Sequence, residues 1–224
     1  MPAARVILFD LDGTVSDSAR GILAALRHAF AVTGLPPMDA RTELAVLGPP
    51  FYESLPPLIG DVPLDAVVDA YRDRYAQSMF DTSVFPGVLD VLDALRERGV
   101  RLAIATSKPE YYAVPIVERL GLSCHFETVG GDERDGSRPS KALVIAHVLS
   151  RLGDVDPADV LMVGDRSHDV LGARAHGIDC VAVGWGYALP GELEAAAPAQ
   201  LCPTPADLAR YLELDCGVDD AAAS

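Results

Sequence analysis

The chain has 224 residues and half of them are hydrophobic, so it can bury a sizeable core. Its 18 basic and 33 acidic side chains give a formal net charge of −15, which argues against a nucleic-acid-binding protein, since neutralising phosphates requires a basic surface. The four cysteines show no C-x-x-C spacing and no apolar run approaches the roughly 18 residues that cross a bilayer, so we expect a reduced, cytoplasmic protein without a membrane partner.

Short apolar runs and amphipathic stretches alternate along most of the chain. The runs predict strands at residues 6–9, 101–105, 160–163 and 180–183, with a weaker strand near 126–129. The stretches between them predict helices at residues 88–98, 110–120, 141–151 and 168–176. Strands that are apolar throughout are typical of a parallel sheet with helices on both faces, so we predict an α/β fold.

The alternation fails between residues 16 and 81, where the pattern is helical. Helices are predicted at 18–32, around 40–47 and at 63–80, and pairs of prolines separate them. We interpret residues 16–81 as a small helical domain inserted after the first strand, with 82–87 as the return linker. The core domain then comprises residues 1–15 and 82–215, with a last helix at 205–214 and a flexible tail at 216–224.

Polar residues follow three of the predicted strands. Asp10 and Asp12 follow the first, Thr106 follows the second, and Asp165 and Asp169 follow the strand at 160–163. In an open parallel sheet the ligand lies beyond the carboxyl ends of the strands, so these side chains should meet in one crevice. Taken singly, the aspartates could instead form solvated turns or cap a helix, but those roles do not explain their coincidence at two strand ends.

The motifs "FDLDGT" and "GDRSHD", with a threonine and a lysine between them, resemble those of the haloacid dehalogenase superfamily. Within that superfamily the chain is similar to the phosphoglycolate phosphatase and 5′-nucleotidase-like group, over about residues 5–190. The resemblance implies a Rossmann-like core with a helical cap inserted after the first strand. The insertion at 16–81 agrees with that expectation.

The resemblance also implies a role for each aspartate. Asp10 would attack phosphorus as the nucleophile, and Asp12 would protonate the leaving oxygen and then activate water. Mg²⁺ would offset the repulsion between these carboxylates and the substrate phosphate. Its expected ligands are the Asp10 carboxylate, the Asp12 backbone carbonyl and Asp165, while Asp169 binds through water or orients the other ligands.

The expected phosphate-binding groups follow from the same comparison. Thr106 would donate its hydroxyl and backbone N–H to the phosphoryl group, although it could also cap a helix, and Ser107 is a weaker candidate. Only two basic residues are lysines, and we favour Lys141 over Lys108 as the charge that balances the phosphate. The remaining predicted substrate contacts are Gly13, which would let the backbone approach the phosphate, and Arg41, for which an ordinary place on a helix surface is equally compatible with the sequence.

These residues predict a Mg²⁺-dependent phosphatase that acts on a small phosphorylated metabolite, such as phosphoglycolate or a nucleoside monophosphate. A sugar-phosphate phosphomutase resembling β-phosphoglucomutase is the main alternative, because it shares the aspartyl phosphate. Dehalogenation is disfavoured by Asp12, since that reaction has no leaving oxygen to protonate. A catalytically silent binding protein is disfavoured because no motif residue is missing. The sequence is compatible with a monomer or a homodimer.

Overall fold

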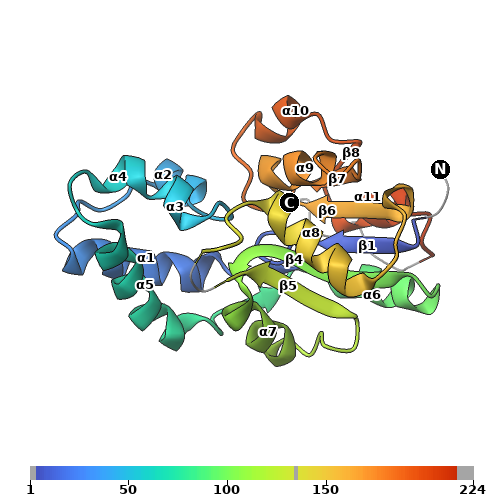
Figure 1. Cartoon of the computed structure of the whole chain (residues 1–224), viewed down its shortest axis with the longest axis horizontal. Helices are drawn as coiled ribbons and strands as arrows, with labels where there is room; N and C mark the ends of the chain where they lie inside the picture. The colour runs from blue at the N-terminus through green and yellow to red at the C-terminus, as the bar shows by residue number, and fades with distance from the viewer. Residues whose placement is uncertain (1–3, 134–135, 216–224) are drawn as a thin grey trace.

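The computed structural model describes residues 4–133 and 136–215, so the predicted tail at 216–224 lies outside the described residues. Within them, a six-stranded parallel sheet forms in the order β5-β4-β1-β6-β7-β8 (Figure 1). The strands are β1 (Val6–Phe9), β4 (Arg101–Pro109), β5 (Thr128–Asp132), β6 (Val160–Gly164), β7 (Asp179–Val183) and β8 (Gln200–Cys202). The predicted α/β fold with a parallel sheet is confirmed.

Helices pack on both faces of this sheet because successive strand side chains point to opposite sides. Ile7 and Phe9 of β1 share a core with α6 (Val88–Glu97), α7 (Glu110–Arg119) and α11 (Pro205–Tyr211). Val6 and Leu8 share a second core with α8 (Lys141–Leu152) and α9 (Ser167–Arg174). Strands that are apolar at every position are therefore what this fold requires.

The first strand lies at the point where the strand order changes direction. Phe9 of β1 is paired with Ile104 of β4 on one side and with Val163 of β6 on the other. The chain builds β4 and β5 outward on one side of β1, then returns to build β6, β7 and β8 on the other. A crevice beyond the carboxyl ends of the strands is expected at such a switch point.

Two strands differ from their predicted bounds by more than one residue. Strand β4 continues through Thr106, Ser107 and Lys108 to Pro109, with a shift of register after Ala105, because β5 still provides a pairing partner there. Strand β5 starts at Thr128, two residues later than predicted. Several short elements were not predicted, because each is too short to show a period; in the core they include η1 (Pro157–Asp159), α10 (Glu192–Ala196) and β8.

The segment predicted as the cap, residues 16–81, folds into five helices that gather beside the sheet (Figure 1). They are α1 (Ala19–Val32), α2 (Ala40–Ala45), α3 (Phe51–Ser54), α4 (Pro56–Ile59) and α5 (Leu64–Ser78). A short antiparallel pair, β2 (Ser16–Asp17) and β3 (Ser83–Val84), joins the chain where it leaves the sheet and where it returns. We keep the name cap for residues 16–81, whose separation as a domain remains a prediction.

None of the helices in the described residues combines the length and apolar character that a membrane crossing needs. The described cysteines, Cys124, Cys180 and Cys202, are free thiols.

Candidate active site

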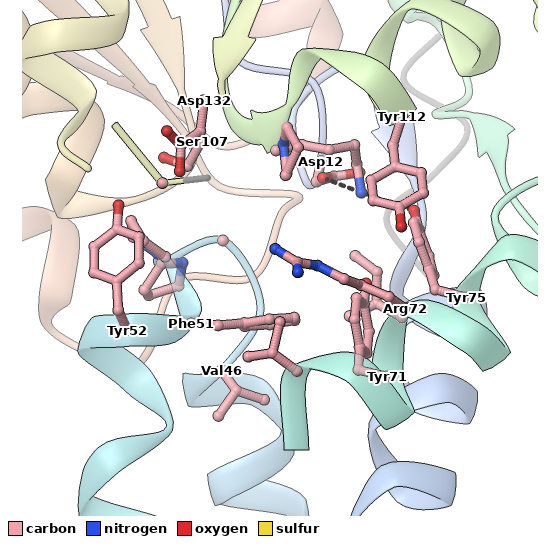
Figure 2. Close-up of a pocket in the computed structure, with 18 of the residues that line it drawn as sticks. Asp12, Val46, Phe51, Tyr52, Tyr71, Arg72, Tyr75, Ser107, Tyr112 and Asp132 are labelled. Atoms are coloured by element: carbon pink, nitrogen blue, oxygen red, sulfur yellow. Dashed lines mark hydrogen bonds and ion pairs between the residues drawn. The ribbon is translucent and has the colours of Figure 1, made fainter. Parts of the chain in front are cut away.

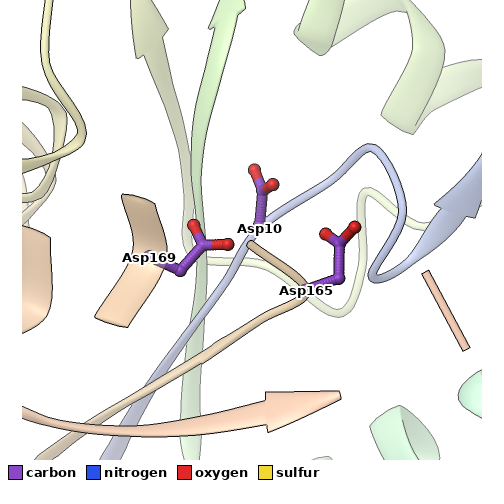
Figure 3. Close-up of side chains that lie close together, drawn as sticks. All are labelled: Asp10, Asp165 and Asp169. Carbon is purple, nitrogen blue, oxygen red and sulfur yellow. The ribbon is translucent and has the colours of Figure 1, made fainter. Parts of the chain in front are cut away.

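Three buried carboxylates lie together at the carboxyl edge of the sheet (Figure 3). Asp10 follows β1, Asp165 follows β6, and Asp169 belongs to the first turn of α9. One oxygen from each lies within 4.8 Å of the others. The Asp165 carboxylate is oriented by the Thr14 hydroxyl at 2.9 Å and the Tyr187 backbone N–H at 2.8 Å. The convergence predicted from strand ends thus brings these three residues into one cluster.

The clustering changes how readily these carboxyl groups ionise. Burial raises the pKa of Asp165 well above its usual value, and the neighbouring Asp10 and Asp169 raise it further. The pKa of Asp10 is also raised, chiefly by burial, although Lys141 works against this effect. The three carboxylates thus offer hard oxygen donors that are buried and close together, and they ionise more readily when a positive charge is nearby. Such a group of donors fits a divalent cation such as Mg²⁺.

Lys141 supplies positive charge to this cluster. Its ammonium lies 2.8 Å from Oδ1 of both Asp10 and Asp169 and donates to the Ala105 carbonyl at 2.9 Å. Burial alone would lower the pKa of Lys141, but the two carboxylates outweigh it, so its pKa is raised and the lysine stays charged. The structure therefore brings Lys141 to the predicted nucleophile.

Asp12 is only two residues from Asp10 but belongs to a different set of contacts. One carboxylate oxygen lies 2.9 Å from the Lys108 ammonium, and the other accepts a hydrogen bond from the Ser18 hydroxyl at 2.5 Å. Lys108 also donates to the Tyr75 hydroxyl of α5 at 2.7 Å. Burial acts to lower the pKa of Lys108, but Asp12 and Tyr75 together raise it. Both lysines are thus placed at the site, each paired with a different aspartate.

The other predicted phosphate contacts lie along the same edge. Thr106 is buried, and its hydroxyl accepts a hydrogen bond from the Lys108 N–H at 3.2 Å, while Ser107 lines the cavity described below. Gly13 has a left-handed φ of 87°, and a Cβ at this position would overlap the Asp165 carboxylate. The need for glycine here therefore comes from Asp165, not only from room for a phosphate as predicted.

A cavity of about 290 Å³ opens between Asp12 and the cap (Figure 2). Tyr71 and Tyr75 stack with 5.0 Å between ring centroids, and Tyr112 meets Tyr75 edge-on at 5.2 Å. Arg72 extends into the cavity, with Phe51 and Tyr71 on one side of it and Asp12 on the other (Figure 2). Asp12 and Lys108 both line this cavity, so the ion pair between them faces it.

The predicted substrate contact Arg41 lies elsewhere. Its side chain is exposed and lines a second cavity, together with Glu53, Arg166 and His168, rather than the cavity beside Asp12. The reason is local: α2 is a six-residue helix with no fully buried residue, and Leu44 packs against the core while Arg41 is exposed. Arg41 thus lies away from the cavity beside Asp12, and its contact with a substrate stays a prediction.

Several residues at the site were not predicted, among them Asp132, Arg72 and Tyr187. Asp132, at the end of β5, is buried and lines the cavity, and the sequence "GGDE" after a predicted strand could have indicated it. Arg72 lies on a helix whose inner face was not identified from the sequence. Tyr187 contacts both Asp165 and the beginning of the cap, and it follows no motif that marks it as a site residue.

The chain is similar in sequence to proteins whose functions are named. The family model described as haloacid dehalogenase-like hydrolase matches residues 7–183. A 5′-nucleotidase of Pseudomonas aeruginosa is 36% identical over 210 residues, which cover 92% of this chain and 95% of that protein. A phosphoglycolate phosphatase of Chromobacterium violaceum is 38% identical over 195 residues, covering 82% and 86% of the two chains.

Other relatives carry a different name. The tyrosine-protein kinase PtkA of Mycobacterium tuberculosis is 47% identical over 185 residues, which cover 82% of this chain. The match spans only 63% of the length of that kinase. Among solved structures, a predicted phosphatase from Clostridium acetobutylicum has a TM-score of 0.88 at 29% identity, covering 94% of this chain and 98% of that one.

Proposed function

Because the chain belongs to the haloacid dehalogenase-like hydrolase family, whose model matches residues 7–183, we propose that it is a Mg²⁺-dependent phosphatase for a small phosphomonoester. The observation that carries this proposal is the pairing of two aspartates with two lysines at one edge of the sheet. Asp10 lies with Lys141 beside two further carboxylates, and Asp12 lies with Lys108 beside the cavity. This provides a nucleophile, an acid–base group and separate positive charges within a single crevice.

The chemistry proceeds in two steps. A carboxylate oxygen of Asp10 attacks phosphorus, the bond from phosphorus to the leaving oxygen breaks, and that oxygen takes a proton from the Asp12 carboxyl group. Asp12 then removes a proton from water, whose oxygen attacks the phosphorus. The bond to Asp10 breaks and inorganic phosphate is released. Thr106 and Lys141 hold the phosphoryl oxygens and balance their charge during both steps.

The carboxylates of Asp10, Asp165 and Asp169 are buried, and one oxygen of each lies within 4.8 Å of the others. Both features fit a site for a divalent cation. When bound there, Mg²⁺ neutralises negative charge and binds a phosphate oxygen. Lys141 alone cannot offset three carboxylates and an incoming phosphate dianion, which supports the need for a metal ion.

The cavity next to Asp12 supports a substrate of modest size. Its aromatic wall suits a ring, such as that of a nucleoside monophosphate, and the guanidinium of Arg72 suits an anionic group, such as the carboxylate of phosphoglycolate. A panel with Mg²⁺ that includes both substrates, sugar phosphates and pyrophosphate would identify the leaving group that the cavity accepts.

The direct test is Asp10→Asn, which removes the nucleophile and keeps the side-chain volume. We expect kcat/KM to fall by about 10⁴-fold or more, with an unchanged circular dichroism spectrum. Asp154→Asn is a matched control, because Asp154 is exposed and lies in a loop away from the site. If Asp10→Asn retained activity within tenfold of the parent chain, the assignment of Asp10 as nucleophile would be refuted.

A second candidate is transfer of the phosphoryl group from Asp10 to an acceptor other than water. It is favoured by the name of the PtkA relatives and by the burial of Asp10 and Asp12 beneath the cap. Incubation with glucose 1-phosphate would reveal a mutase through the 6-phosphate isomer. Incubation with ATP and a tyrosine-containing peptide would reveal a kinase through the phosphopeptide. Release of free phosphate alone supports the hydrolase.

A further inference from the structure

Tyr187 lies on the loop after β7 and holds the segment that connects the sheet to the cap. Its hydroxyl accepts hydrogen bonds from the backbone N–H groups of Ser18, at 2.8 Å, and Ala19, at 3.0 Å. The same hydroxyl donates to Oδ1 of Asp17 at 2.9 Å. A phenol offers one donor and two acceptor sites, so every one of them is used on these three consecutive residues.

This arrangement changes what Ser18 does. Ser18 occupies the N-cap position of α1, where a serine side chain usually accepts a hydrogen bond from the first turn, but here no such bond forms. Instead, the phenol oxygen of Tyr187 binds N–H groups at this helix start. The Ser18 hydroxyl is thereby free to donate to Asp12.

The backbone of Tyr187 contacts the carboxylate cluster. Its backbone N–H donates to Oδ2 of Asp165 at 2.8 Å. The preceding residue, Gly186, lies so close to Gly13 and Asp165 that a Cβ would overlap both. Nearby, the Trp185 indole donates to the Thr14 carbonyl at 3.0 Å. These contacts fix the loop to the sheet edge. Through its hydroxyl, Tyr187 in turn fixes the start of the cap relative to that edge.

We propose that Tyr187 is a positioning residue: it fixes residues 17–19 so that the Ser18 hydroxyl holds Asp12 in place to protonate the leaving oxygen. This inference rests on the acid–base role of Asp12 in the proposed function. Burial, with the nearby Asp12 and Asp17, raises the pKa of the Tyr187 phenol, so the hydroxyl keeps the proton that it donates. Without the phenol oxygen, the Ser18 hydroxyl would turn to cap α1 and release Asp12.

Two variants separate the two parts of this inference. Tyr187→Phe keeps the ring, which packs near Phe85, but removes the hydroxyl that binds Ser18 and Ala19. Ser18→Ala removes only the donor to Asp12 and keeps the backbone N–H groups bound to Tyr187. Tyr211→Phe on α11 is the control for loss of a phenol hydroxyl away from the site.

Hydrogen exchange provides a readout that does not depend on activity. In Tyr187→Phe, amide exchange of residues 17–20 should become faster than in the parent chain, while exchange in β6 stays the same. In Ser18→Ala and Tyr211→Phe, exchange at 17–20 should be unchanged. Unchanged exchange in Tyr187→Phe would overturn the proposed hold on this segment.

The kinetic readout compares two leaving groups. An alkoxide needs protonation as it leaves, whereas p-nitrophenolate needs little, so misplacing Asp12 should lower kcat/KM, which reports the step in which the leaving group departs, about tenfold for phosphoglycolate or AMP but less than about twofold for p-nitrophenyl phosphate. Both Tyr187→Phe and Ser18→Ala should show this split. Equal losses on the two kinds of substrate would overturn the proposal. If the parent chain hydrolysed none of these esters, the proposed function itself would fail, and the exchange data would still decide whether Tyr187 holds the segment.

Discussion

The two lysines of this chain pair with neighbouring aspartates, yet different parts of the molecule build the two pairs. The core cluster, which we define as Asp10, Lys141, Asp165 and Asp169, comes entirely from strand ends and helices of the sheet domain. The junction cluster, defined as Asp12, Lys108, Ser18 and Tyr75, includes two residues of the cap.

This difference separates two properties of the site. None of the four residues of the core cluster belongs to the cap, so we expect metal binding and nucleophilic attack not to depend on where the cap lies. The junction cluster is complete only while Ser18 and Tyr75 lie against the sheet edge, so proton transfer should respond to the cap. Variants in one cluster should therefore affect one property and spare the other.

After Asp10→Asn, the largest effect should come from Lys141→Met in the core cluster. Its ammonium contacts Asp10, Asp169 and the Ala105 carbonyl, so its three donors are used and Met replaces none of them. We expect kcat/KM to fall about 10³-fold, because the phosphoryl group that is transferred loses a buried positive charge.

The same variant should also affect folding. We expect the free energy of unfolding in urea to fall by about 3 kcal/mol without metal, because two buried carboxylates lose their counterion. Lys141→Arg should restore little, as a planar guanidinium cannot match the three ammonium contacts. If Lys141→Arg kept the activity and stability of the parent chain, this account of a fixed core cluster would be contradicted.

A second test concerns pH and Mg²⁺. The pKa of Asp165 is raised in the folded chain, chiefly by burial, so the folded state binds its proton more tightly than the unfolded state does. Its contribution to stability is present below the ordinary pKa of 3.8 and is lost as pH rises through the raised value. Without metal, the protein should therefore become less stable as pH rises above about 4.

Mg²⁺ should counter that loss. At a hundred times its dissociation constant it should add about 2.7 kcal/mol to the free energy of unfolding at pH 8, and less at pH 5, where protons compete for the carboxylates. Urea unfolding at both pH values, with EDTA or with Mg²⁺, measures the difference. Asp165→Asn should flatten the pH dependence, and a Mg²⁺ gain equal at pH 5 and pH 8 would contradict the assignment.

The contrast between the clusters also explains what the sequence could predict. Apolar strands that end in aspartate identify a sheet edge, so the meeting of Asp10 and Asp165 followed from strand order alone. Lys141 could be favoured because lysine is rare here and this one opens a helix. That its ammonium contacts Asp10 and Asp169 depends on how α8 packs on the sheet, and no local sequence pattern encodes this packing.

The junction cluster was harder to predict because its parts come from separate elements. Tyr75 shows a helical spacing with Tyr71 that indicates packing within the cap, but not that its hydroxyl reaches Lys108. Tyr187 is far from Ser18 in sequence, and its role depends on a loop with no period. The cavity that Arg41 lines could not be predicted for a related reason, because a short helix without buried residues does not indicate which cavity its side chains line.

The smallest expected effect, from Tyr75→Phe, tests the junction cluster most selectively. The variant removes the hydroxyl that accepts from Lys108 but keeps the ring, which stacks on Tyr71 and lies 4.7 Å from the Lys108 ammonium. Because Lys108 keeps Asp12 and the ring as partners, the loss of stability should be only about 1 kcal/mol.

The kinetic effect should follow the cap rather than the metal. Loss of this hydrogen bond loosens Lys108, the partner of Asp12, so kcat/KM should fall about threefold for phosphoglycolate or AMP and by less for p-nitrophenyl phosphate. The dissociation constant for Mg²⁺, measured by calorimetry, should not change, because Tyr75 does not touch the core cluster. A weaker Mg²⁺ affinity in Tyr75→Phe would show that the two clusters are coupled, and the independence of metal binding from the cap would have to be abandoned.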